Sequence, residues 1–236
     1  MACRTPFVIL FIGRSGSSHL QSLLGSHPDV NCFDEVFNEK SREGRFQGVE
    51  AVEAHLTEMY SRPETAAGFQ FKYPKQPALF PEVTRWLGAR RSEVRVIQLR
   101  RNNRLKGAIS LQNWKKIRAA TAAANLRADS TYELQPLKLD IDAAIARMRD
   151  HERADIECAS MAEQFEHSHL LTYEELCSDP ASVVSDLLSF LGVDKRPLVS
   201  DLRKATTDDM RTALANYDEV AERLAGTKYA KYLDSP

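Results

Sequence analysis

The sequence lacks long apolar runs and closely paired cysteines, two features that would indicate a membrane protein or a protein held by zinc or disulfides. No apolar run approaches the roughly 18 residues that span a bilayer, and the apolar N-terminal stretch ends after Ile12 in Gly-Arg-Ser-Gly, which is not a small-residue cleavage site. The four cysteines, Cys3, Cys32, Cys158 and Cys177, include no C-x-x-C pair, which favours neither a zinc cluster nor a disulfide framework. We therefore expect a reduced, cytoplasmic protein without a signal peptide or a membrane span.

An excess of charge of one sign is also missing. The 32 Lys and Arg residues against 33 Asp and Glu residues leave a formal net charge of −1. This balance argues against a nucleic-acid partner attracted by a strong positive field, so any anion site must be local. With 236 residues, 43% of them hydrophobic, the chain can bury a sizeable core, and we interpret residues 1–236 as one domain.

Apolar stretches typical of buried strands alternate along the chain with helical patterns. This alternation predicts an α/β fold with a parallel sheet flanked by helices on both faces, and ligands of such sheets bind beyond the C-terminal ends of the strands. The strands are expected at 7–12, 68–71, 94–99 and 169–172, and the helices at 17–24, 49–60, 81–89, 104–117, 140–166 and 180–191.

Residues at the ends of these segments predict how the helices start and stop. Gly25 is expected to end the first helix in the left-handed position after it, and Gly192 is expected to do the same for the last of the six. Thr172 and Glu175 have the spacing of a capping box. The irregular segment 119–139 is interpreted as a long surface loop or lid.

Residues 7–24 read FVILFIGRSGSSHLQSLL, so a loop of Gly, Ser and one Arg joins an apolar strand to a helix. Such a junction offers a phosphate free backbone N–H groups and the positive end of a helix dipole, and Gly13 and Gly16 let the backbone come close. A Walker A motif counted from Gly13 would need lysine at His19 and a hydroxyl at Leu20. The loop therefore predicts a P-loop-like anion site without the Walker residues; a plain tight turn is the alternative.

The loop GRSGSS at 13–18 resembles the [KR]-[ST]-G-[ST]-[ST] loop of sulfotransferases that use 3′-phosphoadenosine-5′-phosphosulfate (PAPS). The resemblance implies that Arg14 is catalytic and meets the bridging and sulfuryl oxygens of the donor. It also implies that the rest of the loop and the start of the helix hold the 5′-phosphate end of the donor. The residues in question are Ser15, Gly16, Ser17, Ser18 and His19.

A second stretch, QLRRNNRLKGAISLQ at 98–112, resembles the 3′-phosphate site of the same family. Its sequence is closest to that of the bacterial branch with trehalose 2-sulfotransferase and lipopolysaccharide-type sulfotransferases. The resemblance implies that Arg101 and Ser110 bind the 3′-phosphate, with Arg100 as the alternative to Arg101. An arginine fork suits a dianionic phosphate. A solvated basic helix start is the competing interpretation, although a helix N-terminus disfavours cations unless an anion is bound.

The segment SHPDVNCFDEVFN at 26–38 resembles the HP…E-x-F segment of that bacterial branch, which implies that Glu35 is the catalytic base. A solvated loop with an acidic pair of Asp34 and Glu35 is the alternative. Lys72, at the end of the second expected strand, either contacts the sulfuryl group or an acidic acceptor, or is simply solvated. We interpret His27 as structural.

Together these resemblances imply a sulfotransferase that moves SO₃ from PAPS to a hydroxyl of a carbohydrate, glycolipid or other small acceptor, with adenosine 3′,5′-bisphosphate as the product. Charge on the donor can be stabilised without a metal, so none is expected. A P-loop kinase or NTPase and a non-catalytic nucleotide-binding protein are the alternatives, and a homodimer is left open. Residues 226–228 near the C-terminus either reach the donor or belong to a frayed tail.

Overall fold

The computed structural model describes residues 4–123, 125–204, 207 and 209–234; Cys3 lies outside these ranges. The chain divides into two compact units. The first is formed by Met1–Arg100 with Ala154–Val199, and the second by Arg101–Arg153 with Ser200–Pro236. The interpretation of the whole chain as one domain stays a prediction.

The first unit contains a five-stranded sheet in which every pair of neighbouring strands is parallel. Central strand β1 is buried along its whole length, which explains its uninterrupted apolar sequence. Along the sheet the order is β2-β3-β1-β4-β5. The strands are β1 (Thr5–Ile12), β2 (Val30–Phe33), β3 (Ala66–Tyr73), β4 (Arg95–Arg100) and β5 (Ser168–Thr172).

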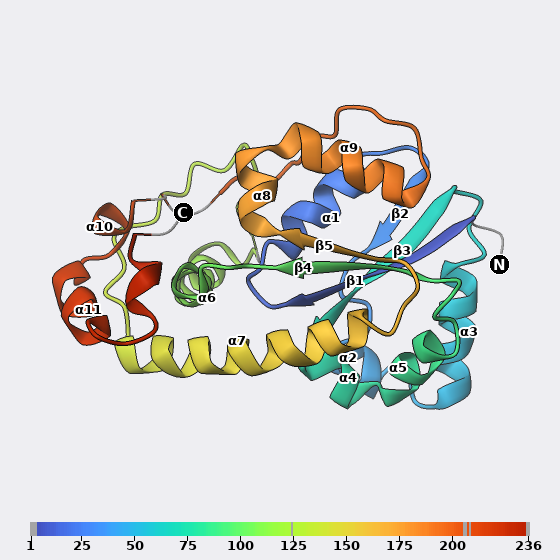
Figure 1. Ribbon diagram of the computed structural model, residues 1–236, viewed down its shortest axis with the longest axis horizontal. Helices are drawn as coiled ribbons and strands as arrows, with labels where there is room; N and C mark the ends of the chain where they lie inside the picture. Colours follow the sequence, from blue (N-terminus) through green and yellow to red (C-terminus); the bar gives the residue numbers. More distant parts are fainter. Residues whose placement is uncertain (1–3, 124, 205–206, 208, 235–236) are drawn as a thin grey trace. The chain divides into compact units, whose positions relative to one another are not determined.

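Helices cover both faces of this sheet (Figure 1). Alternate residues of β1 enter two hydrophobic clusters, Phe7 and Ile9 on one face and Val8 and Leu10 on the other. The predicted α/β fold with a parallel sheet flanked on both faces is confirmed. The first face packs against α1 (Ser17–Gly25), α8 (Tyr173–Ser178) and α9 (Pro180–Leu191), and the second against α3 (Val49–Met59), α5 (Pro81–Gly88) and the end of α7 (Ile141–Ala162).

Two short helices follow strands of the first unit, α2 (Glu39–Glu43) after β2 and α4 (Lys75–Leu79) after β3. Neither helix was predicted, and neither was β2. Four or five residues are too few to display a periodicity, and a four-residue edge strand after Pro-Asp resembles a loop.

The second unit is helical and has its own apolar cluster, which contains Leu105, Met148 and Val220. Part of the predicted lid belongs to this cluster, because Leu137 and Leu139 are buried in it. The C-terminal end of the segment is therefore anchored, and its first residues continue the preceding helix. The helices are α6 (Arg104–Thr121), the first part of α7, α10 (Met210–Ala213), α11 (Tyr217–Leu224) and a 3₁₀ turn (Ala230–Tyr232).

The helix ends of the structure agree with two of the three capping predictions. The capping box of Thr172 and Glu175 is present, and Gly192 ends α9 with φ 70°, so both predictions are confirmed. The prediction for Gly25 is wrong. Helix α1 includes Gly25 and is capped by Ser26 at φ −81°, so no left-handed residue is needed there.

Within the described ranges, no helix has the length and apolarity needed to cross a bilayer.

Gly68 sets how closely β3 approaches β1. A Cβ at this position would lie 2.4 Å from the carbonyl oxygen of Phe7, the acceptor to which the Tyr60 hydroxyl donates at 2.9 Å. We predict that Gly68→Ala lowers the free energy of unfolding by about 1–3 kcal/mol, as overpacking does. Gly25→Ala is the matched control, because a Cβ there meets nothing within 4 Å; urea unfolding should find it neutral or stabilising. Equal stability of the two variants would contradict this account.

Candidate functional site

The loop between β1 and α1 has a backbone that is unfavourable for a residue with a side chain. The Ser15 N–H donates to the Ile12 carbonyl at 3.1 Å, closing a tight turn, and the third residue of that turn, Arg14, has φ 75°. Gly16, the N-cap of α1, follows with φ 95°. A left-handed non-glycine residue costs about 1–3 kcal/mol and is typical of functional sites.

Ser15 is the residue of this loop that most directly fits an anion. It is buried, and its Oγ finds no hydrogen-bond partner among the residues that the structure describes. Left-handed residues on either side of it favour a concave arrangement of backbone N–H groups, and the positive end of α1 adds to the field there. A phosphate or sulfate oxygen at this loop would satisfy the Ser15 hydroxyl, so the residues present fit such a group.

The other loop residues singled out from the sequence lie in the first turn of α1. Ser17 is buried, while Ser18 and His19 are half-buried. Burial lowers the pKa of His19 below its usual value, so the neutral imidazole is favoured near neutral pH. A neutral ring can contact an anionic ligand as a hydrogen-bond donor.

Two residues from elsewhere in the first unit hold the loop, and neither was predicted. Gln70 of β3 is buried and donates from Nε2 to the Ser17 carbonyl at 3.1 Å. Tyr173 of α8 packs on Gly16 so closely that a Cβ on that glycine would lie 2.3 Å from Cδ2 of the tyrosine ring. The capping box beginning at Thr172 indicated only a helix start, so the sequence carried no signal for the contact of Tyr173 with the loop.

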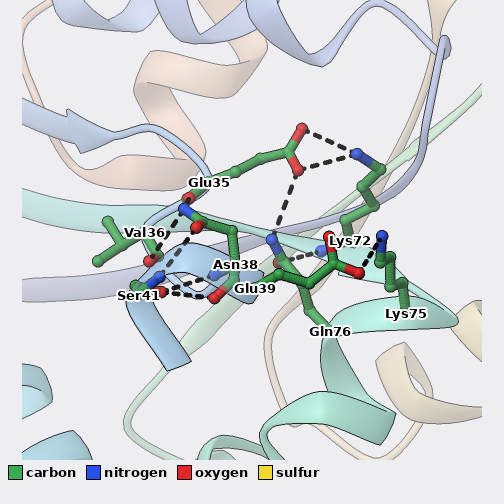
Figure 2. A network of polar contacts seen from close by, with 8 residues as sticks. All are labelled: Glu35, Val36, Asn38, Glu39, Ser41, Lys72, Lys75 and Gln76. Carbon is green, nitrogen blue, oxygen red and sulfur yellow. Dashed lines mark hydrogen bonds and ion pairs between the residues drawn. The ribbon is translucent and has the colours of Figure 1, made fainter. Parts of the chain in front are cut away.

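Glu35 and Lys72 form an ion pair at the carboxyl ends of β2 and β3 (Figure 2). The Lys72 Nζ lies 2.9 Å from Glu35 Oε2 and 3.3 Å from Oε1. Both side chains are about one-third exposed, at 33% for Glu35 and 32% for Lys72. Asp34 is exposed. The structure therefore shows an ion pair for Glu35 and Lys72 in place of two solvated side chains, whereas the neighbouring Asp34 is exposed.

This ion pair lies on the same face of the sheet as α1. Phe71 and Tyr73 enter the cluster on the opposite face, so Lys72 between them points to the α1 side. Ile12, the last residue of β1, pairs with Tyr73, and the loop therefore leaves the sheet level with Lys72. The candidate anion loop and the acid–base pair thus gather at one edge of the first unit.

His27 has a scaffold role, as expected. Its ring is buried, and both nitrogens have partners: Nδ1 accepts from the Asp29 N–H at 3.0 Å, and Nε2 lies 2.9 Å from the Asp194 carbonyl. Since a backbone N–H can only donate, the proton sits on Nε2. Neither nitrogen is left for proton transfer.

The second predicted stretch opens α6 in the second unit. Asn103 caps the helix: its Oδ1 accepts from the Lys106 N–H at 2.9 Å. Arg101 is buried, and a Cβ on Gly107 would lie 4.0 Å from its Cδ. The arginine side chain therefore lies against α6 one turn before half-buried Ser110. This placement favours Arg101 over Arg100, and the choice stays a prediction.

The C-terminal segment is anchored within the second unit. Lys228 Nζ lies 2.6 Å from Glu152 Oε2, and the Tyr229 hydroxyl donates to the same oxygen at 3.2 Å. Hydrogen bonding from Lys228 lowers the pKa of Glu152. Asn103 also donates to the Tyr232 carbonyl at 3.0 Å. The frayed-tail interpretation is therefore wrong for the described residues up to 234.

The two buried cysteines of the described residues, Cys32 and Cys158, are poorly suited to act as nucleophiles. Cys32, Cys158 and Cys177 are free thiols. Burial raises the pKa of Cys158 to about 12, and it raises that of Cys32 as well, which suppresses the reactive thiolate. Among the described residues, no group of three or more His, Cys, Asp or Glu side chains is placed to hold a metal ion.

Comparisons with known proteins agree with one another. The family model described as "Sulfotransferase domain" matches residues 4–232. Nodulation protein H of Rhizobium meliloti (strain 1021) is 26% identical over 245 residues, covering 97% of this chain and 95% of that protein. Nodulation protein H of Rhizobium tropici is 26% identical over 247 residues, with 97% and 93% covered.

Two solved structures share the fold. A sulfotransferase from Alicyclobacillus acidocaldarius aligns with a TM-score of 0.54 at 17% identity, covering 99% of this chain and 97% of that one. A mouse sulfotransferase complexed with PAP aligns with a TM-score of 0.51 at 13% identity, covering 98% and 87%. At these identities the likeness concerns the fold alone.

The unfavourable backbone at Arg14 predicts that stability and ligand binding separate there. Arg14→Gly removes the cation and relieves the left-handed strain, so the free energy of unfolding should stay level or rise by up to about 1 kcal/mol. Loss of a charge-assisted hydrogen bond should weaken adenosine 3′,5′-bisphosphate binding about ten- to a hundredfold. Urea unfolding and calorimetry measure the two effects. Arg14→Ala keeps the strain and should lose binding without gaining stability; normal binding by either variant would contradict the assignment.

Proposed function

Because the chain belongs to the sulfotransferase family, we propose that it transfers a sulfuryl group from PAPS to a hydroxyl of a carbohydrate, glycolipid or other small acceptor. The observation that carries the proposal is the pairing of Glu35 with Lys72 at the sheet edge from which the anion loop leaves. A base and a loop suited to an oxyanion are the two elements that such a transfer requires. A cytoplasmic location and a homodimer stay predictions.

In this proposal the loop binds the phosphosulfate end of the donor. Ser15 Oγ, the loop N–H groups and the hydroxyls of Ser17 and Ser18 hold the 5′-phosphate, with His19 beside them. Arg14 contacts the bridging oxygen, on which negative charge grows as the S–O bond to the phosphate breaks. Stabilising that charge is the main catalytic task in transfers of this kind, and the residues named here supply it without a metal.

Glu35 acts as the general base. As the acceptor oxygen bonds to sulfur, its proton passes to the Glu35 carboxylate, while the electron pair of the broken S–O bond stays on the phosphate of adenosine 3′,5′-bisphosphate. Lys72 Nζ, at 2.9 and 3.3 Å from the two carboxylate oxygens, orients the Glu35 side chain. In this proposal Lys72 also contacts the transferred sulfuryl group or an acidic acceptor.

The 3′-phosphate of the donor is assigned to Arg101 and Ser110. The burial of Arg101 against α6 and the positive end of that helix both favour a dianionic group. The solved structure of a mouse sulfotransferase complexed with PAP, which is adenosine 3′,5′-bisphosphate, supports a ligand of this kind.

Two measurements separate this function from its rivals. Thermal shift with adenosine 3′,5′-bisphosphate against Mg-ATP distinguishes a sulfotransferase from a P-loop kinase, which would need lysine at His19 and a hydroxyl at Leu20. A mass-spectrometric screen of hydroxylated acceptors for the gain of one SO₃ distinguishes an enzyme from a non-catalytic binder. Stabilisation by Mg-ATP alone, or no product in the screen, would contradict the proposal.

The assignment of the 3′-phosphate predicts a selective loss on mutation. Arg101→Ala should weaken the binding of adenosine 3′,5′-bisphosphate about ten- to a hundredfold while leaving adenosine 5′-phosphate nearly unaffected, because only the first ligand carries the group that Arg101 contacts. Calorimetry with both ligands measures the difference. Equal losses would refute the assignment, and the same pair of titrations on Arg100→Ala identifies the arginine that is used.

The base assignment predicts a loss of turnover without a loss of donor binding. Glu35→Gln keeps the size of the side chain and removes the proton acceptor, so single-turnover sulfation should slow by about 10²–10⁴-fold. Asp34→Asn is the matched control and should be mild, since Asp34 is exposed. If Glu35→Gln turns over normally while Asp34→Asn is inactive, the neighbouring acid is the base.

A further inference from the structure

Gln76, to which the sequence assigned no role, connects the two members of the ion pair. It lies in the short helix α4 after β3 and is only 2% exposed. Its Oε1 accepts from the Lys72 backbone N–H at 2.7 Å, and its Nε2 donates to Glu35 Oε2 at 3.5 Å (Figure 2). One buried side chain therefore contacts the main chain of Lys72 and the carboxylate of Glu35.

The backbone contact determines which way the Gln76 amide faces. A backbone N–H can only donate, so the amide oxygen must face Lys72, and the NH₂ group is then directed to Glu35. The pairing of β2 with β3 ends at Phe33 and Phe69, and Lys72 lies beyond that end. Beyond the end of that pairing, Gln76 Oε1 is the acceptor for the Lys72 backbone N–H. The orientation of the Gln76 amide therefore follows from the position of the β3 backbone.

The donors reach the two oxygens of Glu35 unequally. Oε2 takes Lys72 Nζ at 2.9 Å and Gln76 Nε2 at 3.5 Å, whereas Oε1 has Lys72 Nζ at 3.3 Å. Oε1 therefore keeps more lone-pair capacity to receive a proton. The Asn38 side chain donates to the Glu35 carbonyl at 2.8 Å, so the backbone beneath this carboxylate is held as well.

We infer that Gln76 is a positioning residue for the general base: through its contacts with the Lys72 N–H and Glu35 Oε2 it orients the Glu35 carboxylate, leaving Oε1 to the acceptor hydroxyl. The inference rests on the proposed role of Glu35 as the base. Gln76 acts through Glu35 and through the main chain of Lys72, not on the donor itself.

Gln76 is a neutral hydrogen-bond donor that lies near two ion pairs. Lys72 of β3 faces Glu35, while Glu39 of α2 and Lys75 of α4 pair with each other at 2.9 Å. The hydrogen bond from Lys75, together with the charges of Lys75 and Lys72, lowers the pKa of Glu39. A carboxylate in place of the Gln76 amide would add a negative charge next to Glu35 without adding a cation.

Gln76→Glu tests this role, since it keeps the size of the side chain and an oxygen for the Lys72 N–H but replaces the donor facing Glu35 with an acceptor. We expect a folded variant whose affinity for adenosine 3′,5′-bisphosphate changes by less than about twofold. We expect kcat to fall about tenfold through misplacement of the base. Repulsion between two carboxylates should also move the acid limb of the pH dependence of kcat upward by about one unit. A purely structural residue would lower kcat equally at all pH values.

Two further variants keep the test decisive. Gln47→Glu makes the same change at an exposed glutamine that donates to the Glu43 carbonyl, and its acid limb should coincide with that of the unmodified protein. Gln76→Met removes the donor without adding charge, so its limb should move in the same direction by a smaller amount. An unmoved limb in every folded Gln76 variant overturns the inference.

The two proposals fail in different ways. If Glu35→Gln is inactive but the limb stays in place in the Gln76 variants, Glu35 remains the base and only the positioning role of Gln76 is overturned. If Glu35→Gln turns over normally, the base assignment fails, and the inference for Gln76 fails with it.

Discussion

The parallel pairing of β1 with β3 is the constraint on which the candidate site of the first unit depends. The register runs without a break from Thr5 opposite Ala66 to Ile12 opposite Tyr73, and the absence of a side chain at Gly68 permits the close approach. Because both strands run in the same direction, the loop after Ile12 and the Lys72 side chain emerge at one edge and on one face. A shift of one residue would turn Lys72 into the apolar cluster on the other face.

At that edge the loop after β1 contains two local arrangements that lower the stability of the fold. Arg14 occupies a left-handed backbone, and Ser15 buries a hydroxyl without a partner among the described residues. Either feature costs free energy. Gln70 and Tyr173 contact the adjacent residues Ser17 and Gly16 and so support the loop. A bound oxyanion would use both, since it accepts from the hydroxyl and pairs with the cation.

The acid–base pair illustrates a second physical point. An ion pair that is one-third exposed contributes little to stability, so Glu35 and Lys72 matter for orientation more than for folding. Gln76 adds to that orientation from a buried position, where a side chain has few alternative conformations. The candidate base is thus held by a network whose members come from β3, α4 and the segment after β2.

Local patterns were sufficient for most of the fold, because the elements concerned are long or end in strong signals. The strand at 7–12, the capping box at Thr172 and the left-handed Gly192 all depend on neighbours in sequence. β2, α2 and α4 were missed since four or five residues show no period, and Gly25 was misread because a helix can end without a left-handed residue.

By itself, the sequence predicted the alternation of the longer strands and helices, a loop suited to an anion at 13–18 and the charged candidate residues. Only the tertiary structure decided which of them meet. The pairing of Glu35 with Lys72, the contact of Tyr173 with Gly16 and the bridge through Gln76 join residues far apart in sequence or hidden in a short helix. Such contacts depend on strand register and layer packing, which are properties of the whole sheet and leave no local pattern along the chain.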